Sequence, residues 1–210
     1  MSADAMSSDA EVTLLVFAKA PIPGKVKTRL MPSLDAEQAC DVHVELLKRT
    51  LEVSCQVFPA ARVQLWAGLA PRHPLLEALA ARHGIALHAQ PSGDLGQRMH
   101  TALSAQRGPA LLIGSDCPVL TPALLARCVG ALNAYDLVML PAEDGGYALI
   151  GGHRLSARLF EDMAWGNSEV GAQTLARARE LGLRVVCPGT VWDIDTPRDL
   201  ARWRNRGDST

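Results

Sequence analysis

Four cations gather in one short loop near the start of the chain, directly after its first apolar segment. They lie within the stretch KAPIPGKVKTRL and are Lys19, Lys25, Lys27 and Arg29. Gly24 in the same stretch allows the backbone to pass close to a ligand, and no carboxylate occurs from Val12 through Leu34. Cations this close repel one another unless water or a bound anion separates them. The loop is therefore either a solvated basic turn or half of a phosphate-binding site.

Two acidic segments further along the chain carry the oxygen ligands of a magnesium site. Asp116 follows the apolar run Ala110–Gly114, and Asp193 and Asp195 flank Ile194, so an extended backbone places both of these carboxylates on one face. Mg²⁺ is typically held by one or two carboxylates together with substrate phosphates. Asp116 and Asp195 are therefore the predicted metal ligands. The alternatives are a simple turn role for Asp116 and an exposed strand end for Asp193 and Asp195.

A glycine-containing turn precedes one of the expected helices and is a candidate for donor binding. Gly93 and Gly96 could bring backbone amides against a base or a ribose, and Arg98 could meet negative charge. Asp94 lies between the two glycines and belongs to the same predicted donor-binding set. Taken alone, this signal is weak.

Two further segments point to the acceptor side of a site. Gly145 and Gly146 allow close approach before Tyr147, and Asp144 could accept a proton from an acceptor hydroxyl or hydrogen-bond to it. Trp165 could stack on a sugar or a base. The alternatives are an ordinary Asp-Gly hairpin and a tryptophan at the edge of the core. The predicted substrate-binding residues are Gly145, Gly146, Tyr147, Trp165 and Asp193.

Several well-known site classes are excluded by spacing. The first loop lacks the second glycine of a G-x-x-x-x-G-K-[ST] phosphate loop, and neither G-x-G-x-x-G nor G-x-S-x-G occurs. The five cysteines form no C-x-x-C pair, which speaks against a zinc site and a disulfide framework. The six histidines show no metal-binding spacing and are interpreted as surface or helix-face residues.

Short apolar runs alternate with segments of helical period, which predicts βαβ units and a mostly parallel α/β sheet. The expected strands are 12–17, 62–67, 86–89, 110–114, 136–140, 147–150 and 184–186. The expected helices are 36–55, 74–82, 94–106, 122–132, 168–181 and 197–204. The pair formed by 136–140 and 147–150 predicts an antiparallel excursion near the sheet edge. Thr121-Pro122 and Thr196-Pro197 mark two helix starts, which leaves Asp116 and Asp195 without a capping role.

Length and composition predict one domain of 11–206 between two tails, 1–10 and 207–210. The chain has 210 residues, 48% of them hydrophobic, and a net charge of −1. This balance gives no support for a nucleic-acid partner or an anionic membrane, and no apolar run reaches the length of a membrane span. The tail 1–10 holds several Ser and Ala and no apolar core, unlike a signal peptide. We expect a cytoplasmic protein, and its oligomeric state does not follow from the sequence.

Five ordered motifs resemble one known family. They are the first loop from Phe17 to Leu30, Gly93–Gly96, Gly114–Pro118, Asp144–Tyr147 and Asp193–Leu200. They are similar to the bacterial glycosyltransferase-like family linked to radical-SAM and selenium-domain proteins and to arsenosugar biosynthesis. The resemblance implies a GT-A fold, a Rossmann-like mixed sheet with helices on both faces that binds a nucleotide-diphosphate donor with Mg²⁺ or Mn²⁺. More distantly, the motifs resemble sugar-nucleotide and phospholactate nucleotidyltransferases. Asn167-Ser168 departs from the threonine expected after Trp165-Gly166.

The leading functional expectation is a metal-dependent transferase that joins a nucleotide-diphosphate sugar donor to a small-molecule acceptor. Asp144, Lys27 and Arg29 are the expected catalytic residues, and the expected donor-binding residues are Lys19, Gly24, Lys25, Lys27, Arg29, Gly93, Asp94, Gly96 and Arg98. The close alternative is nucleotidyl transfer from a nucleoside triphosphate to a phosphorylated acceptor, with release of pyrophosphate. A nucleotide-binding protein without catalysis and a cysteine hydrolase using Cys117 are the alternatives from other classes.

Overall fold

The computed structural model describes residues 11–153 and 155–207, and within them every predicted strand and helix is present. The strands are β1 (Thr13–Lys19), β2 (Val63–Gly68), β3 (Ala86–Ala89), β4 (Ala110–Gly114), β5 (Leu137–Pro141), β6 (Tyr147–Gly152) and β7 (Val185–Val186). The α-helices are α1 (Ala36–Val57), α2 (Pro74–His83), α3 (Leu95–Ser104), α4 (Pro122–Ala131), α5 (Val170–Glu180) and α6 (Pro197–Gly207). Short 3₁₀ helices are η1 (Thr28–Leu30), η2 (Ala60–Arg62) and η3 (Ala157–Leu159).

The predicted tails fall mostly outside the described residues. Residues 1–10 and 208–210 lie outside them, whereas Gly207, assigned to the tail from the sequence, is the last residue of α6. The assignment of 11–206 to one domain stays a prediction, in keeping with the pairing of all seven described strands in one sheet. Within 11–153 and 155–207, no helix combines the length and the apolar character needed to cross a membrane.

The sheet has the order β3-β2-β1-β4-β6-β5-β7. All its pairs are parallel except those of β6, which runs antiparallel to both β4 and β5. The predicted antiparallel excursion is therefore confirmed, and its strands β5 and β6 lie second and third from the β7 edge of the sheet. Strand β6 lies inside the sheet because its residues 148–152 are buried on both faces. An exposed edge could not accommodate such an apolar run as well.

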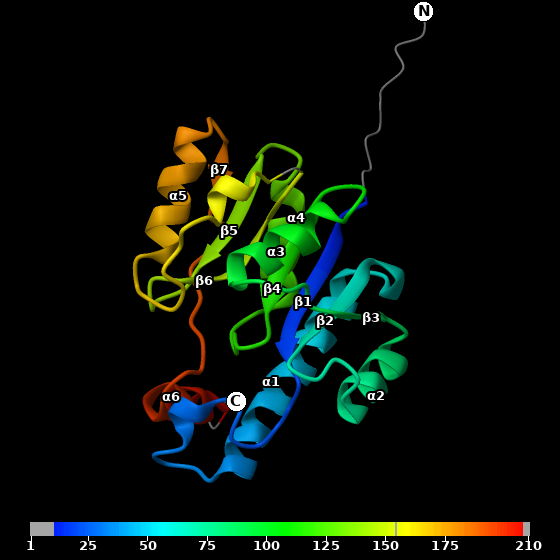
Figure 1. Ribbon diagram of the computed structural model, residues 1–210, viewed down its shortest axis with the longest axis vertical. Helices are drawn as coiled ribbons and strands as arrows, with labels where there is room; N and C mark the ends of the chain where they lie inside the picture. The colour runs from blue at the N-terminus through cyan, green and yellow to red at the C-terminus, as the bar shows by residue number, and fades with distance from the viewer. Residues whose placement is uncertain (1–10, 154, 208–210) are drawn as a thin grey trace, which may run out of the picture.

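The chain changes direction across the sheet at β1 (Figure 1). Strands β2 and β3 are added on one side of β1, and β4 then returns to the other side. From there the chain runs from β1 to β2 on one side, and from β4 toward β6 and β5 on the other. In open α/β sheets such a switch point forms the crevice in which ligands bind. The fold thus places the loops that follow Lys19 and Gly114 beside the same crevice.

Two apolar layers hold the helices on opposite faces of the sheet. Alternate side chains of β1 divide between them, Leu14 and Val16 facing one layer and Leu15 and Phe17 the other. The first layer contains buried residues of α1, α2 and α4, whereas the second contains buried residues of α3 and α5. Figure 1 shows α3 in front of the central strands, so the predicted covering of both faces is confirmed.

A third apolar cluster joins the cationic loop and α1 to the segment that leads into α6. Leu30 from the cationic loop packs with Leu46 of α1, Ile194 and Leu200 of α6. In Figure 1 the red helix α6 lies beside the blue first loop. Ile194 is fully buried, which turns the flanking Asp193 and Asp195 away from this cluster. The cluster therefore holds the aspartate segment next to the cationic loop.

The predicted helix caps explain which acids remain free for other roles. The Thr121 hydroxyl accepts a hydrogen bond from Leu124 N at 3.2 Å at the start of α4. At the start of α6 the Thr196 hydroxyl accepts from Asp199 N at 3.4 Å, and the Asp199 carboxylate accepts from Thr196 N at 2.8 Å. These contacts satisfy the first amides of both helices. Neither Asp116 nor Asp195 is used as a cap.

Candidate active site

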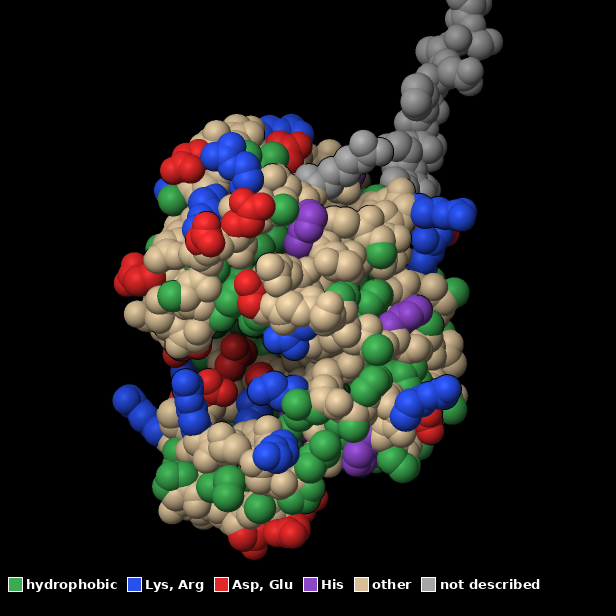
Figure 2. Space-filling model, in the orientation of Figure 1, with side chains coloured by type: hydrophobic (Ala, Val, Ile, Leu, Met, Phe, Trp, Pro, Cys, Tyr) green, Lys and Arg blue, Asp and Glu red, His purple; other side chains and the backbone are tan. Residues whose placement is uncertain are grey.

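An open cleft of about 570 Å³ lies at the carboxyl edge of β1 and β4. Charged side chains of both signs line it: Lys19, Lys27, Arg29, Arg98, Asp116, Asp144 and Asp195. Figure 2 shows a hollow on the left of the view, around which lysine or arginine and acidic side chains gather. The cleft therefore combines cations with carboxylates at the sheet's switch point.

Lys27 joins the two predicted metal ligands. Its Nζ lies 2.8 Å from Asp116 Oδ1 and 3.6 Å from Asp195 Oδ1, and donates a hydrogen bond of 2.6 Å to the carbonyl of Ile194. The Lys27 side chain is only 4% exposed, whereas both carboxylates are over 40% exposed. Its backbone is left-handed with φ 49°, an uncommon conformation for a residue with a side chain. The loop thus adopts a less favourable backbone in order to place one ammonium group between two carboxylates.

The backbone links the same segments. Ile194 N donates a hydrogen bond of 3.1 Å to the carbonyl of Asp116. Val191 N donates to Pro141 O, and Glu143 N donates to Val191 O, so the segment also follows the end of β5. Residues separated by almost eighty positions in the chain are consequently held by main-chain bonds as well as by charge.

The other predicted residues of the first loop differ in whether they line the cleft. Arg29 pairs with Asp195 at 3.2 Å from Nη1 to Oδ2 and is 69% exposed, and Lys19 is exposed and lines the cleft. Lys25 is exposed but does not line the cleft, and Gly24 with φ 73° serves the turn itself. Lys19, Lys27 and Arg29 are therefore the cations that the fold brings to the cleft, and Lys25 and Gly24 are not among its walls.

Asp193 is a carboxyl group held among other carboxylates. Its pKa is raised to about 7, first by burial and then by the neighbouring Asp116, Asp144 and Asp195, against the lowering effect of Lys27. Its Oδ1 is buried without a hydrogen-bond partner in the described part of the chain. Such an arrangement of acids is unfavourable unless positive charge is added.

The donor set fits a hard divalent cation completed by phosphate. Asp116 and Asp195 already share a cation, Lys27, and both present oxygen to the cleft. Among residues 11–153 and 155–207, no cluster of three or more His, Cys, Asp or Glu side chains is arranged to hold a metal by itself. Two carboxylates plus substrate oxygens match the usual Mg²⁺ site, which rarely has an all-protein shell.

His43 is a cleft residue that sequence reasoning missed. It lies on α1, is buried, and its Nε2 is 3.0 Å from the carbonyl of Lys19. A carbonyl only accepts, so Nε2 carries the proton, and burial lowers the pKa of His43 and keeps the ring neutral. Its Nδ1 faces Asp116 Oδ1 at 4.0 Å. The residue could be found in the sequence only by noticing that position 43 shares a helix face with buried Leu46 and Leu47.

The turn before α3 divides into structural and cleft-lining residues. Asp94 caps α3 by accepting from Gln97 N at 2.9 Å, and Gly93 has φ 107°, where a Cβ would collide with Gln97. A Cβ on Gly96 would lie 2.6 Å from Phe160 O and from the Trp165 ring. These three predicted donor-binding residues therefore have structural roles and do not line the cleft.

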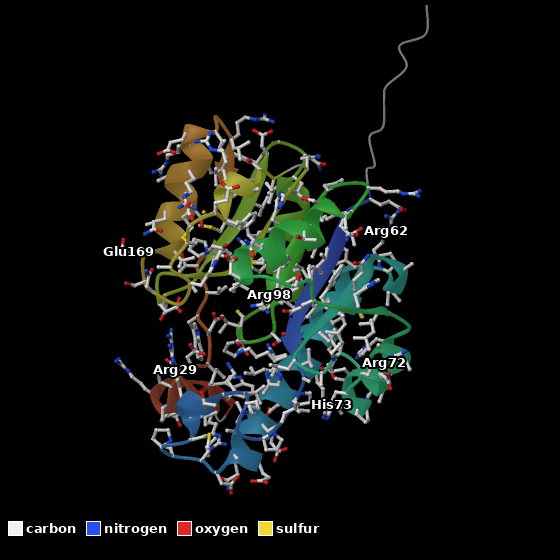
Figure 3. The ribbon with its side chains drawn as sticks, viewed as in Figure 1. Arg29, Arg62, Arg72, His73, Arg98 and Glu169 are labelled. Carbon is white, nitrogen blue, oxygen red and sulfur yellow. The ribbon has the colours of Figure 1, made fainter. Side chains whose placement is uncertain are left out.

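Arg98 is the member of that turn that reaches the cleft. Its Nη1 donates 2.9 Å to Gln90 Oε1, and the Gln90 amide nitrogen donates to the carbonyls of Ala18 and Trp66. Gln90, a second residue missed from the sequence, thereby positions Arg98 against the ends of β1 and β2. Figure 3 shows Arg98 extending from α3 and Arg29 coming from the loop beside α6.

Most of the residues predicted for the acceptor side lie around a second, smaller pocket next to the cleft. Asp144 and Gly166 border both spaces, whereas Gly146, Tyr147 and Trp165 line the pocket alone. The Asp144 Oδ1 accepts a hydrogen bond of 2.9 Å from Gly146 N, as in an Asx turn. Gly145 lines neither space, because it packs so closely on Ser168 that a Cβ would lie 1.9 Å from the Ser168 carbonyl oxygen. Asp193 also lies outside the lining of both the cleft and the pocket.

Comparison with known families places the chain in one of them. The family described as "Uncharacterized protein conserved in bacteria (DUF2064)" matches residues 50–167. The chain belongs to this family. The region matched to DUF2064 includes Asp116, Asp144 and Trp165, whereas Lys27 and Asp195 lie outside it. No curated protein matches the chain.

Solved structures extend the comparison over almost the whole DUF2064 chain. A provisionally assigned nucleotide-diphospho-sugar transferase from Desulfovibrio desulfuricans G20 is 28% identical, with 95% of this chain and 89% of that chain covered and a TM-score of 0.79. A CMP:2-keto-3-deoxy-manno-octonic acid synthetase complexed with CTP is 12% identical, with 94% and 98% covered and a TM-score of 0.59. Rv0371c from Mycobacterium tuberculosis H37Rv, complexed with manganese, is 21% identical, with 91% and 97% covered and a TM-score of 0.54. The predicted mixed, mostly parallel α/β fold of the nucleotide-diphospho-sugar transferase type is confirmed.

Cys117 of this DUF2064 chain has the surroundings of a core residue. It is 2% exposed, and burial raises the pKa of its thiol to about 12, with Asp193 acting in the same direction. Both ring nitrogens of nearby His43 face other groups. We expect iodoacetamide at neutral pH to label exposed Cys187 and to leave Cys117 unmodified in the folded protein, as measured by peptide mass mapping. Fast labelling of Cys117 would restore the hydrolase alternative.

Proposed function

We propose that this protein is a metal-dependent transferase that uses a nucleotide-diphosphate sugar as donor. The observation that carries the proposal is the cluster of Lys27, Asp116 and Asp195 at the switch point of the sheet. The Lys27 Nζ lies 2.8 Å from Asp116 Oδ1 and 3.6 Å from Asp195 Oδ1. The similarity in fold to nucleotide-dependent transferases supports it. The resemblance of the ordered motifs to a glycosyltransferase-like family favours sugar as the transferred group.

In this proposal the charges of the cleft are divided between donor and metal. Lys19, Lys27 and Arg29 neutralise the donor phosphates, and Arg98 lies close enough in the cleft to add to them. Asp116 and Asp195 hold Mg²⁺ or Mn²⁺, which when bound supplies positive charge to the diphosphate. Fixed cations favour the leaving group most when its charge is fully developed, so they lower the barrier more than they strengthen ground-state binding.

In the transfer step, Asp144 is the residue that acts on the proton of the acceptor hydroxyl. The acceptor hydroxyl oxygen forms a bond to the anomeric carbon, and the bond from that carbon to the diphosphate oxygen breaks. The nucleoside diphosphate leaves with the electron pair, and Asp144, which also orients the hydroxyl, accepts the hydroxyl proton. The position of Asp144 at the border of cleft and pocket supports this role.

A thermal-shift panel tests the donor assignment. Nucleoside triphosphates, nucleoside diphosphates and nucleotide sugars are added with Mg²⁺, with Mn²⁺ or with a chelator. We expect one nucleotide sugar to raise the midpoint of unfolding by several degrees only with the metal, because binding to the native state alone stabilises it. A panel in which no nucleotide shifts the midpoint under any condition would overturn the proposal. Binding without turnover of any donor would leave a nucleotide-binding protein.

Nucleotidyl transfer is the second candidate because four cations line the cleft. A triphosphate carries more charge than a sugar diphosphate and suits Lys19, Lys27, Arg29 and Arg98 at least as well. In that reaction an acceptor phosphate would attack the α-phosphate and release pyrophosphate. An assay of pyrophosphate release with the four nucleoside triphosphates and phosphorylated acceptors distinguishes the two reactions, since glycosyl transfer produces none.

A further inference from the structure

The smaller pocket beside the cleft has the shape and lining of a site for a compact, largely apolar molecule. It has a volume of about 200 Å³ and borders on the cleft at Phe17, Asp144 and Gly166. Its walls come from β1, α3, β4, β6, the segment before α5 and the first residue of α5, with Phe17, Met99, Leu112, Tyr147, Trp165 and Val170 among them. Because an apolar cavity of about 150 Å³ already accommodates benzene, this pocket is large enough for roughly one ring.

The charges around the pocket distinguish it from the cleft. Among the described residues that line it, Asp144 is the charged one, whereas Lys19, Lys27, Arg29 and Arg98 all line the cleft. Burial raises the pKa of Tyr147, so its hydroxyl is neutral at physiological pH. A phosphate group in this pocket would face a carboxylate without a compensating cation, which is unfavourable in a partly desolvated site.

Two polar atoms on residues that line the pocket are buried without a partner within the described chain, the Trp165 indole nitrogen and the Tyr147 hydroxyl. The indole Nε1 of Trp165 is buried and unpaired. The ring itself is held in place, because its Cζ2 lies 2.6 Å from where a Cβ would stand on Gly96 of α3. A buried donor without a partner is destabilising, and a hydrogen bond to a ligand oxygen would remove that cost. The residues around the pocket therefore carry two unpartnered donors, the Trp165 indole and the Tyr147 hydroxyl, among mostly apolar walls.

We infer that this pocket binds the acceptor, and that the acceptor is an uncharged hydroxyl compound about the size of one ring, with an apolar face and no phosphate group. The inference rests on the proposed transferase function, since it assigns the second substrate of that reaction. It follows from the apolar walls, the single carboxylate at the border and the unpaired indole nitrogen. It also favours glycosyl transfer over nucleotidyl transfer to a phosphorylated acceptor.

Matched pairs of probes test the inference without knowledge of the natural acceptor. Benzyl alcohol is compared with benzyl phosphate, and glucose with glucose 6-phosphate, by saturation-transfer NMR titration of the full chain. We expect the neutral member of at least one pair to bind at least roughly ten-fold more tightly than its phosphate. The preference should persist with a saturating nucleotide and Mg²⁺, and Asp144→Asn should reduce it. Donor binding is followed separately by thermal shift.

Tryptophan variants show whether the probe occupies this pocket. Trp165→Phe retains a ring and loses the N–H donor, and we expect neutral binding to weaken roughly five-fold while nucleotide binding is unchanged. Trp203→Phe on α6, outside the pocket, is the matched control and should bind like the wild type. Tighter binding of the phosphates, binding of neither member, or displacement of the neutral probe by nucleotide alone would overturn the inference. A failure of every nucleotide to bind would instead contradict the proposed function.

Discussion

Asp116→Ala is expected to lower metal-dependent turnover of the nucleotide donor by at least roughly 100-fold, because it removes one of two carboxylates that would hold the metal. The fold should persist. Lys27 keeps its hydrogen bond to Ile194 O and its ion pair with Asp195, and the Asp116 carbonyl still accepts from Ile194 N. Steady-state rates across Mg²⁺ and Mn²⁺ concentrations measure the effect.

A matched substitution separates this loss from a general effect of removing an aspartate. Asp41→Ala changes an exposed aspartate on α1 that does not line the cleft, and it should retain wild-type rates. Circular dichroism and the unfolding midpoint of both variants establish that each is folded. Full activity of Asp116→Ala at saturating metal would show that the metal assignment is wrong.

Lys27→Met is expected to reduce the free energy of unfolding by roughly 1–3 kcal/mol in the presence of a chelator. The change removes the buried ammonium group between Asp116 and Asp195, and these carboxylates then repel each other and Asp193. The expected loss is smaller than the roughly 3–5 kcal/mol of a fully buried pair because both carboxylates are over 40% exposed. Methionine has a similar length and the same backbone requirement at φ 49°, so the comparison measures the loss of the ammonium group, with its ion pairs and its hydrogen bond to Ile194 O.

The same variant gives a second readout, its response to metal. Mg²⁺ or Mn²⁺ should raise the unfolding midpoint of Lys27→Met more than that of the wild type, because the carboxylates no longer share a cation. Lys25→Met, two residues away at an exposed position outside the cleft, should resemble the wild type in both measurements. Urea unfolding with chelator and with metal provides the data. Equal stability and equal metal response of Lys27→Met and the wild type would disprove the role of Lys27.

The elements of the fold could be predicted because the local signals agree with the global arrangement. The run Ala110–Gly114 is apolar throughout, as a strand covered on both faces requires, and α1 carries a buried stripe at helical spacing. Pro122 and Pro197 mark helix starts at the observed positions. The position of β6 between β4 and β5 could not be predicted, because antiparallel pairing is recognisable from a short turn whereas strand order depends on the whole sheet.

The candidate site could be predicted only in part. Charge density singled out Lys27 and Arg29, and position after an apolar strand singled out Asp116. His43 and Gln90 were missed because one lies in a helix and the other follows a short edge strand, where side-chain type alone predicts no role. Asp94, Gly93 and Gly96 were assigned to donor binding, although capping and close packing account for them in the structure. Glycine and aspartate serve turns and ligands through the same properties, so sequence alone does not separate the two uses.

Residue type and spacing along the chain determined the elements, their ends and the chemistry available to them, because apolar period, capping and turn preference act over a few neighbouring residues. Tertiary structure alone decided which charges meet. Lys27 contacts Asp116 and Asp195 because burial of Leu30 and Ile194 in one cluster holds the first loop against the last segment. The tertiary structure also decided that the cationic cleft and the apolar pocket are separate spaces. Their division depends on which faces of β1, β4 and β6 the helices cover. Contacts between distant segments arise from packing of the whole core, which no local pattern specifies.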